Sequence, residues 1–219
     1  MLALIFDTET TGLIPKGMKN DIDNMIVHFP YIVQLSFILL NCDTLEIVES
    51  HDYIIKVPDS VEISAKSTEI HGIDRKICDE KGIDIKEGLV AFSSSYDKAN
   101  VVVGHNMDFD IEVVQIESVR NEFGTMINKN HVDKKFYCTM RNTITLCGLI
   151  GKNSRGRYKK YPKQSELHQK LFGTEPKNLH NSYNDILVCT RCYVKLEHNK
   201  DICEYNEEIK NIYSKLLEV

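Results

Sequence analysis

The sequence predicts a mixed α/β fold in which a sheet is covered by helices. The chain opens with a short apolar run at 1–6, and two runs rich in β-branched and aromatic residues follow at 31–41 and 47–57. These runs predict three consecutive strands. A buried strand at 100–104 is then followed by a helical pattern at 109–123. Because a strand followed by a helix comes after the opening strands, we expect helices to cover the faces of one sheet.

The composition is that of a globular protein. The 219 residues are 42% hydrophobic and 27% charged, which fits one domain with a sizeable core. The formal net charge of −5 excludes nucleic-acid binding by overall positive charge, so such binding needs a local basic patch. We expect neither a membrane span nor a signal peptide. The seven cysteines are odd in number and irregularly spaced, which favours reduced thiols in the cytoplasm.

The first strand ends in acids. Since successive side chains of a strand alternate between faces, Asp7 and Glu9 point to one face and Thr8 points to the other. Two adjacent carboxylates repel each other unless a cation lies between them, and hard divalent cations prefer oxygen ligands. The alternative is a solvated strand end with ordinary surface acids, which the pair alone would favour, so the rest of the chain must decide.

The middle of the chain alternates between loops, strands and helices. The segment 11–30 is polar and contains glycine and proline, which predicts a loop. The strands at 31–41 and 47–57 are joined by a short connection, which predicts an antiparallel hairpin. A short helix at 64–73, closed by Gly72, and an amphipathic helix at 83–98 follow.

The last third of the chain is predicted to be helical. Helices are expected at 165–172 and 183–196. The segment 199–219 is predicted as an amphipathic C-terminal helix that packs on a domain covering 1–198. A partner helix or a dimer contact is the alternative. Its apolar residues at steps of three and four are Ile202, Tyr205, Ile209, Ile212 and Leu216.

A basic segment lies at 151–163. It contains six lysines or arginines and two tyrosines but no acid. Cations interleaved with aromatic rings suit a single-stranded nucleic acid, because phosphates meet the cations and bases stack on the rings. A solvated loop is the alternative. The candidate nucleic-acid patch consists of Lys152, Arg155, Arg157, Tyr158, Lys159 and Lys160.

Two further polar groups join the acids of the first strand. Asp110 follows the end of a buried strand, where binding groups concentrate in α/β sheets, and His180 and Asp185 stand at the start of a late helix. Four carboxylates can hold two divalent cations about 3.5–4 Å apart, an arrangement used for phosphoryl displacement. A histidine beside them can accept the proton of the attacking water.

These motifs resemble those of the DEDD exonuclease superfamily, and in particular its proofreading-subunit (DnaQ-like) branch. Asn181 stands where another branch has tyrosine, so the histidine-containing branch matches. The resemblance covers roughly 2–196. The matching residues are Phe6-Asp7-Thr8-Glu9-Thr10-Thr11-Gly12, Gly104-His105-Asn106 with Phe109-Asp110, and His180 with Asp185.

The resemblance implies a ribonuclease H-like fold, a mixed five-stranded sheet with helices on both faces. It implies a metal-dependent 3′→5′ exonuclease that releases nucleoside 5′-monophosphates from a nucleic-acid 3′ end, with DNA favoured and a DNA polymerase as a candidate partner. An exoribonuclease and a non-catalytic polymerase subunit are the alternatives. The stretch 151–177 is longer and more basic than in compact members, and together with the residues up to Tyr193 it resembles versions encoded by large DNA viruses.

The resemblance also implies roles for single residues. Asp7 would bridge two Mg²⁺ or Mn²⁺ ions, Glu9 and Asp185 would complete the first site, and Asp110 would hold the second ion. His180 would be the general base. The residues expected around the 3′-terminal nucleotide are Thr8, Thr10, Leu13, His71, Asn106 and Phe109.

Overall fold

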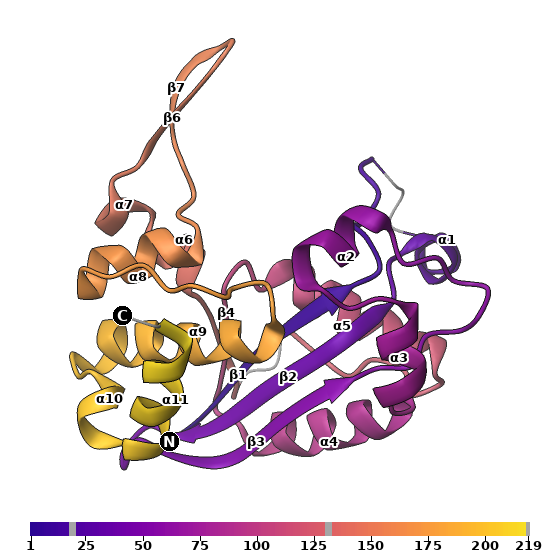
Figure 1. Ribbon diagram of the computed structural model, residues 1–219, viewed down its shortest axis with the longest axis horizontal. Coiled ribbons are helices and arrows are strands. Elements are labelled where there is room, and N and C mark those ends of the chain that lie inside the picture. Colours follow the sequence, from indigo (N-terminus) through magenta and orange to yellow (C-terminus); the bar gives the residue numbers. More distant parts are fainter. Residues whose placement is uncertain (18–20, 130–132, 218–219) are drawn as a thin grey trace.

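A five-stranded mixed sheet forms the centre of the computed structural model, which describes residues 1–17, 21–129 and 133–217 (Figure 1). The strand order is β3-β2-β1-β4-β5; the first three strands are antiparallel neighbours, and β4 and β5 continue the sheet parallel to β1. This confirms the predicted α/β fold. The strands are β1 (Leu2–Thr10), β2 (Ile32–Asn41), β3 (Glu46–Ile54), β4 (Val101–Gly104) and β5 (Lys135–Cys138).

Helices cover both faces of the sheet, and β1 contributes to the core on each side. Ala3 and Ile5 pack against α8 (Gln164–Phe172) and α9 (Ser182–His198), whereas Leu4 and Phe6 pack against α4 (Ile85–Lys98) and α5 (Asp108–Arg120). The alternation of the opening apolar run therefore serves two cores.

The C-terminal segment forms two helices where one was predicted. They are α10 (Ile202–Tyr205) and α11 (Glu207–Leu217). The helix is interrupted at Asn206, whose side-chain oxygen accepts a hydrogen bond from the Ile209 amide at 3.0 Å. Ile202, Ile209 and Tyr213 are buried in the core on the α9 side, so this segment packs on the sheet-forming part of the chain. The Leu216 side chain and residues 218–219 lie outside the described residues.

The loop predicted over 11–30 was wrong in part, because α1 (Ile22–His28) forms there. The Asp21 side chain caps α1 by accepting from the Asp23 amide at 3.3 Å. The partly buried Arg120 donates to the carbonyls of Ile26 and Phe29 at 2.8 and 2.6 Å, which fixes the end of the helix. A distant arginine thus helps to hold this short helix, and the helical spacing of Ile22, Met25 and Ile26 was its signal in an otherwise polar segment.

Shorter elements complete the fold. The predicted helix before Gly72 is α2 (Ala65–His71), and α3 (Arg75–Lys81) follows it. After β5 come α6 (Thr139–Asn142) and α7 (Ile144–Cys147). The basic segment then forms an antiparallel hairpin of β6 (Ile150–Asn153) and β7 (Gly156–Lys159), which projects from the domain (Figure 1). None of the helices in the described part of the chain has the length and hydrophobicity of a membrane span.

Candidate active site

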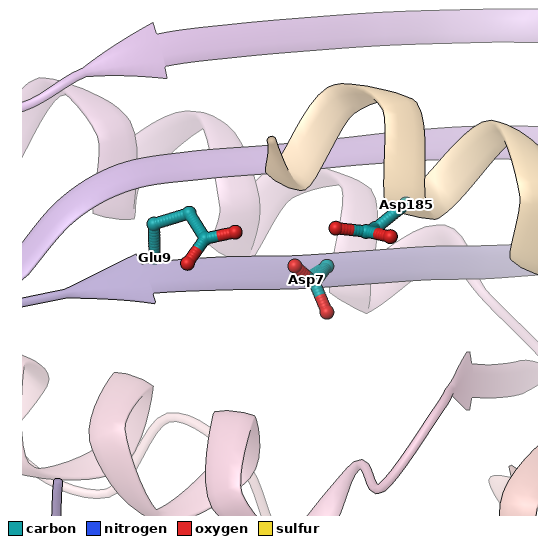
Figure 2. Close-up of side chains that lie close together, drawn as sticks. All are labelled: Asp7, Glu9 and Asp185. Atoms are coloured by element: carbon teal, nitrogen blue, oxygen red, sulfur yellow. The ribbon is translucent and has the colours of Figure 1, made fainter. Parts of the chain in front are cut away.

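Three carboxylates converge above the end of β1. Asp7 and Glu9 continue the face of β1 that packs against α9, and Asp185 lies in the first turn of that helix. Figure 2 shows the two β1 side chains below the helix that carries Asp185. One carboxylate oxygen from each residue lies within 4.8 Å of the other two. This spacing lets the three carboxylates share one cation.

Asp110 approaches from the opposite face of the sheet. Thr8, which points to that face, binds one oxygen of Asp110 through its amide at 3.0 Å and its hydroxyl at 2.7 Å. Asp110 is 4% exposed and lies outside the group of three carboxylates. It lines the same cavity, and its charge raises the pKa of both Asp7 and Glu9. Thr8 therefore holds a fourth carboxylate beside the other three.

The four carboxyls repel one another in a partly buried site, where only Asp110 is fully enclosed. Burial, followed by repulsion from the other acids, raises the pKa of Asp7 well above its usual range and that of Glu9 from 4.5 to about 8. Burial raises the pKa of Asp110 and Asp185 to about 7. No ion pair among the residues that the structure describes includes any of the four. A hard divalent cation fits this donor set, since it would supply the missing positive charge.

A cavity of about 770 Å³ opens over the carboxylates, and His180, Asn106 and Phe109 line it with them. The amide of His180 donates to Asp185 at 3.0 Å, and the His180 side chain is exposed. Asn106 turns the chain between β4 and α5 with a φ of 64°. The structure thus places the predicted base beside the predicted ligands.

Of the other residues expected around a terminal nucleotide, Thr8 also lines the cavity, whereas Thr10, Leu13 and His71 lie outside its lining. Leu13 is 84% exposed. His71 donates through Nε2 to the Thr10 carbonyl at 3.2 Å and accepts through Nδ1 from the Ile73 amide at 3.0 Å, so both ring nitrogens are engaged within the protein. Burial lowers the pKa of His71 and favours its neutral form. In the structure His71 joins α2 to the end of β1.

A polar network that the sequence did not reveal positions the start of α9. Gln34 and Ser36 of β2 stand opposite the two acids of β1. The Ser36 hydroxyl lies 2.6 Å from that of Ser182, and Gln34 accepts from the Ser182 amide at 3.2 Å. Asp52 of β3 accepts from both β2 side chains at 2.8 and 2.7 Å. Two polar residues at alternate positions of an apolar strand were the signal for this network, which anchors the helix that carries Asp185.

Comparison with known proteins gives a family match and a number of similar solved structures. The exonuclease (RNase_T) family model matches residues 4–193. Escherichia coli exonuclease I in complex with a dT13 oligonucleotide has a TM-score of 0.67 at 18% identity, over 96% of this chain and 45% of that chain. An exonuclease I structure described as suggesting how processivity is achieved has a TM-score of 0.67 at 19% identity, over 92% of this chain and 42% of that chain. The ExoI/SSB-Ct complex has a TM-score of 0.64 at 17% identity, over 92% of this chain and 42% of that chain.

These likenesses confirm the ribonuclease H-like fold that the sequence motifs implied. The chain spans less than half the length of the exonuclease I chains that it matches. No curated protein matches the sequence.

Proposed function

The chain belongs to the exonuclease family, and from this premise we propose that it is a metal-dependent 3′→5′ exonuclease that releases nucleoside 5′-monophosphates. One observation carries the proposal: Asp7, Glu9, Asp110 and Asp185 face one cavity beside the exposed His180. A non-catalytic binding module would have no use for four carboxylates that repel both one another and a phosphate.

We propose that these acids hold two Mg²⁺ or Mn²⁺ ions. Asp7, Glu9 and Asp185 would hold one ion, because their oxygens lie within 4.8 Å of one another. Asp110, which the Thr8 amide and hydroxyl hold in place, would hold the second. When bound, such ions lower the pKa of an attacking water and stabilise the charge on the leaving 3′ oxygen.

The protein's own groups orient the substrate and move the proton. The His180 side chain accepts the proton of the attacking water, because it faces the cavity and its backbone is tied to Asp185. Asn106 and Phe109 form the wall against which the terminal nucleotide lies. The network beneath α9 keeps His180 and Asp185 in place during the reaction.

We favour a single-stranded or frayed DNA 3′ end as the substrate. Exonuclease I, whose fold this chain shares, is seen in complex with a dT13 oligonucleotide, which supports a single-stranded substrate. An RNA 3′ end is the second candidate, since recognition of the 2′-hydroxyl depends on contacts at the terminal nucleotide. A DNA polymerase partner, as in proofreading subunits, stays a prediction, as does the similarity to versions encoded by large DNA viruses. Five of the seven cysteines are buried free thiols, which supports a reducing, cytoplasmic location.

The proposal is tested with 5′-labelled DNA and RNA oligonucleotides, each offered single-stranded, paired and with a 3′ mismatch. The native chain is expected to shorten at least one of them with Mg²⁺ or Mn²⁺, and to do nothing in chelator. Asp7→Ala is expected to abolish shortening, whereas Asp79→Ala, a change at an exposed position of α3, serves as the matched control. Undiminished activity of Asp7→Ala would refute the assignment of the site.

A further inference from the structure

The basic hairpin is the strongest unexplained feature of the surface. We call residues 150–163 the arm; they comprise β6, β7 and the segment that leads into α8. The side chains of Lys152, Arg155, Arg157 and Lys159 are exposed. Within the described ranges, no ion pair includes any of these four. In a chain whose net charge is −5, these four side chains form a concentrated positive surface that no acid of the described residues neutralises by an ion pair.

An aromatic ring is held among these cations. Tyr158 pairs with Gly151 across the hairpin. A Cβ added to Gly151 would lie only 2.5 Å from the Tyr158 ring, so the ring packs directly on the glycine backbone. Tyr158 is nevertheless 48% exposed. The glycine therefore supports a ring that remains accessible to a base, in the alternation of cations and rings that suits single strands.

The base of the arm forms part of the cavity over the carboxylates. Tyr161 and Lys163 line that cavity, and Tyr161 is 54% exposed. Lys160 pairs with Glu166 of α8 at 2.5 Å, and the same carboxylate accepts from the Lys163 amide at 2.7 Å. The base of the arm is thus fixed on α8 while its outer part projects.

His105 ties this base to the strand that leads into the site. Its Nε2–H donates to the Pro162 carbonyl at 3.1 Å, and its Nδ1 accepts from the Thr139 hydroxyl at 2.9 Å. Burial lowers the pKa of His105 to about 4, so the ring is neutral and offers one donor and one acceptor. His105 stands beside Asn106 in the motif that ends in Asp110. The arm is therefore held in a fixed position relative to the carboxylates.

A further cation continues this surface at the cavity wall. Arg141 lines the cavity and pairs with Asp108, which also accepts from Lys129 at 2.7 Å. Arg141 and Lys163, the last residue of the arm, both line the cavity that holds the four acids, so positive charge lies on the cavity wall. A polyanion whose end lies in the cavity would therefore contact cations along its length, from the cavity wall to the hairpin.

We propose that the arm binds the single strand on the 5′ side of the nucleotide that is removed, which rests on the proposed exonuclease function. Arg155 and Arg157 meet the phosphates, and Tyr158 and Tyr161 stack on bases. The five residues from Lys160 to the turn extend roughly 17 Å at about 3.3 Å per residue. That length corresponds to about five stacked nucleotides at roughly 3.4 Å each. Because the arm is continuous with the cavity, a single-stranded nucleic acid is favoured over an acidic protein as its partner.

The test compares two charge-reversed variants of the whole chain. Arg155→Glu with Arg157→Glu changes the arm, and Lys81→Glu with Lys86→Glu makes the same charge change at exposed positions of α3 and α4. Binding of labelled 16-nucleotide DNA and RNA single strands is measured by fluorescence anisotropy in chelator, which prevents cleavage. We expect the arm variant to bind at least one of them at least tenfold more weakly, and the control to stay within about twofold of the native protein.

The salt dependence and substrate length add two independent readouts. Removing two phosphate contacts is expected to reduce the slope of log affinity against log salt by about 1.4, at about 0.7 per contact. The kcat/KM for the 16-mer divided by that for a trinucleotide is expected to fall at least fivefold in the arm variant only. Arg155→Gln with Arg157→Gln, which adds no acid, is expected to show the same trends more weakly.

The outcomes separate this inference from the proposed function. The inference would be overturned if the arm variant bound the single strands like the native protein and kept the same ratio of kcat/KM between the 16-mer and the trinucleotide. That result would also be expected if the arm bound a protein partner. Equal losses in the arm variant and in the control would also overturn it. If the native protein binds the 16-mer through the arm but cleaves nothing with either metal, the inference about the arm is supported and the proposed exonuclease function is refuted.

Discussion

Glu9→Gln should make the metal-free protein more stable at pH 8, which is the opposite of the usual effect of changing a residue in the protein interior. The side chain keeps its size and loses its charge. The pKa of Glu9 is raised from 4.5 to about 8 by burial and by the charges of Asp185 and Asp110. In the native protein without metal, the stability contributed by this group is complete below about pH 4.5 and is lost as the pH rises through about 8. Glutamine carries no such loss.

The magnitude follows from the pKa. At about 1.36 kcal/mol per pKa unit, the rise from 4.5 to about 8 corresponds to roughly 5 kcal/mol. Glu9 keeps partial contact with water, which screens part of the repulsion, so we expect about 2 kcal/mol at pH 8. For a chain of this size each kcal/mol shifts Tm by about 2–4 °C, so the variant should melt roughly 4–8 °C above the native protein in chelator. At pH 5 the free energies of unfolding of the variant and the native protein should differ by less than about 1 kcal/mol.

Melting is followed by circular dichroism in chelator and in 10 mM Mg²⁺ at both pH values. With Mg²⁺ at pH 8 the order should reverse, because the native protein gains the binding energy of the cation and the variant has lost one ligand. Glu62→Gln, at an exposed position, is the control and should change stability by less than about 0.5 kcal/mol. This reasoning would be refuted if the variant had a lower Tm than the native protein in chelator at pH 8. It would also be refuted if the difference in Tm between the two were the same at both pH values.

Three further changes test other contacts of the site. Thr8→Val removes the hydroxyl that binds Asp110 at 2.7 Å, and should raise the Mg²⁺ concentration for half-maximal cleavage by about fivefold to tenfold; an unchanged titration would contradict it. His180→Ala should lower kcat by about 10²–10⁴-fold while Mg²⁺ affinity, measured by calorimetry, stays within about threefold. Gln34→Leu leaves the Ser182 amide without its acceptor and should lower the free energy of unfolding in urea by about 1–3 kcal/mol.

The local geometry of the site could be predicted from the period of a strand. Because alternate side chains share a face, the sequence alone placed Asp7 and Glu9 together and Thr8 opposite. The structure shows the consequence, since Thr8 binds Asp110 on the other face. The start of the late helix also predicted that His180 and Asp185 would lie close together. These predictions depend on neighbours in the chain, where spacing determines geometry.

Elements without a buried face could not be predicted in the same way. The arm has exposed side chains on both strands, so no apolar alternation marks it as a hairpin. Its turn depends on the Asn153 side chain, which accepts from the Arg155 amide at 2.8 Å, and on Gly156 with a φ of 122°. In the C-terminal segment the apolar spacing runs unbroken past Asn206, so periodicity could not reveal the division into two helices.

Contacts between distant segments were also beyond the sequence. The network from Gln34 and Ser36 to Ser182 needs the register of β2 against β1 and the position of α9 above them. The place of His71 depends likewise on the path of α2, which brings its ring to the Thr10 carbonyl. Spacing within a motif carries no information about such packing.

The most direct test of the central claim is the identity of the released product as a function of label position and metal. A single-stranded oligonucleotide is labelled at its 5′ end or within its 3′-terminal nucleotide, and products are separated by chromatography with Mg²⁺, Mn²⁺ or chelator. We predict immediate release of the 3′ label as a nucleoside 5′-monophosphate, progressive shortening of the 5′-labelled strand, and neither in chelator. Release of the 5′ label first, internal cuts, or equal activity in chelator would contradict the account.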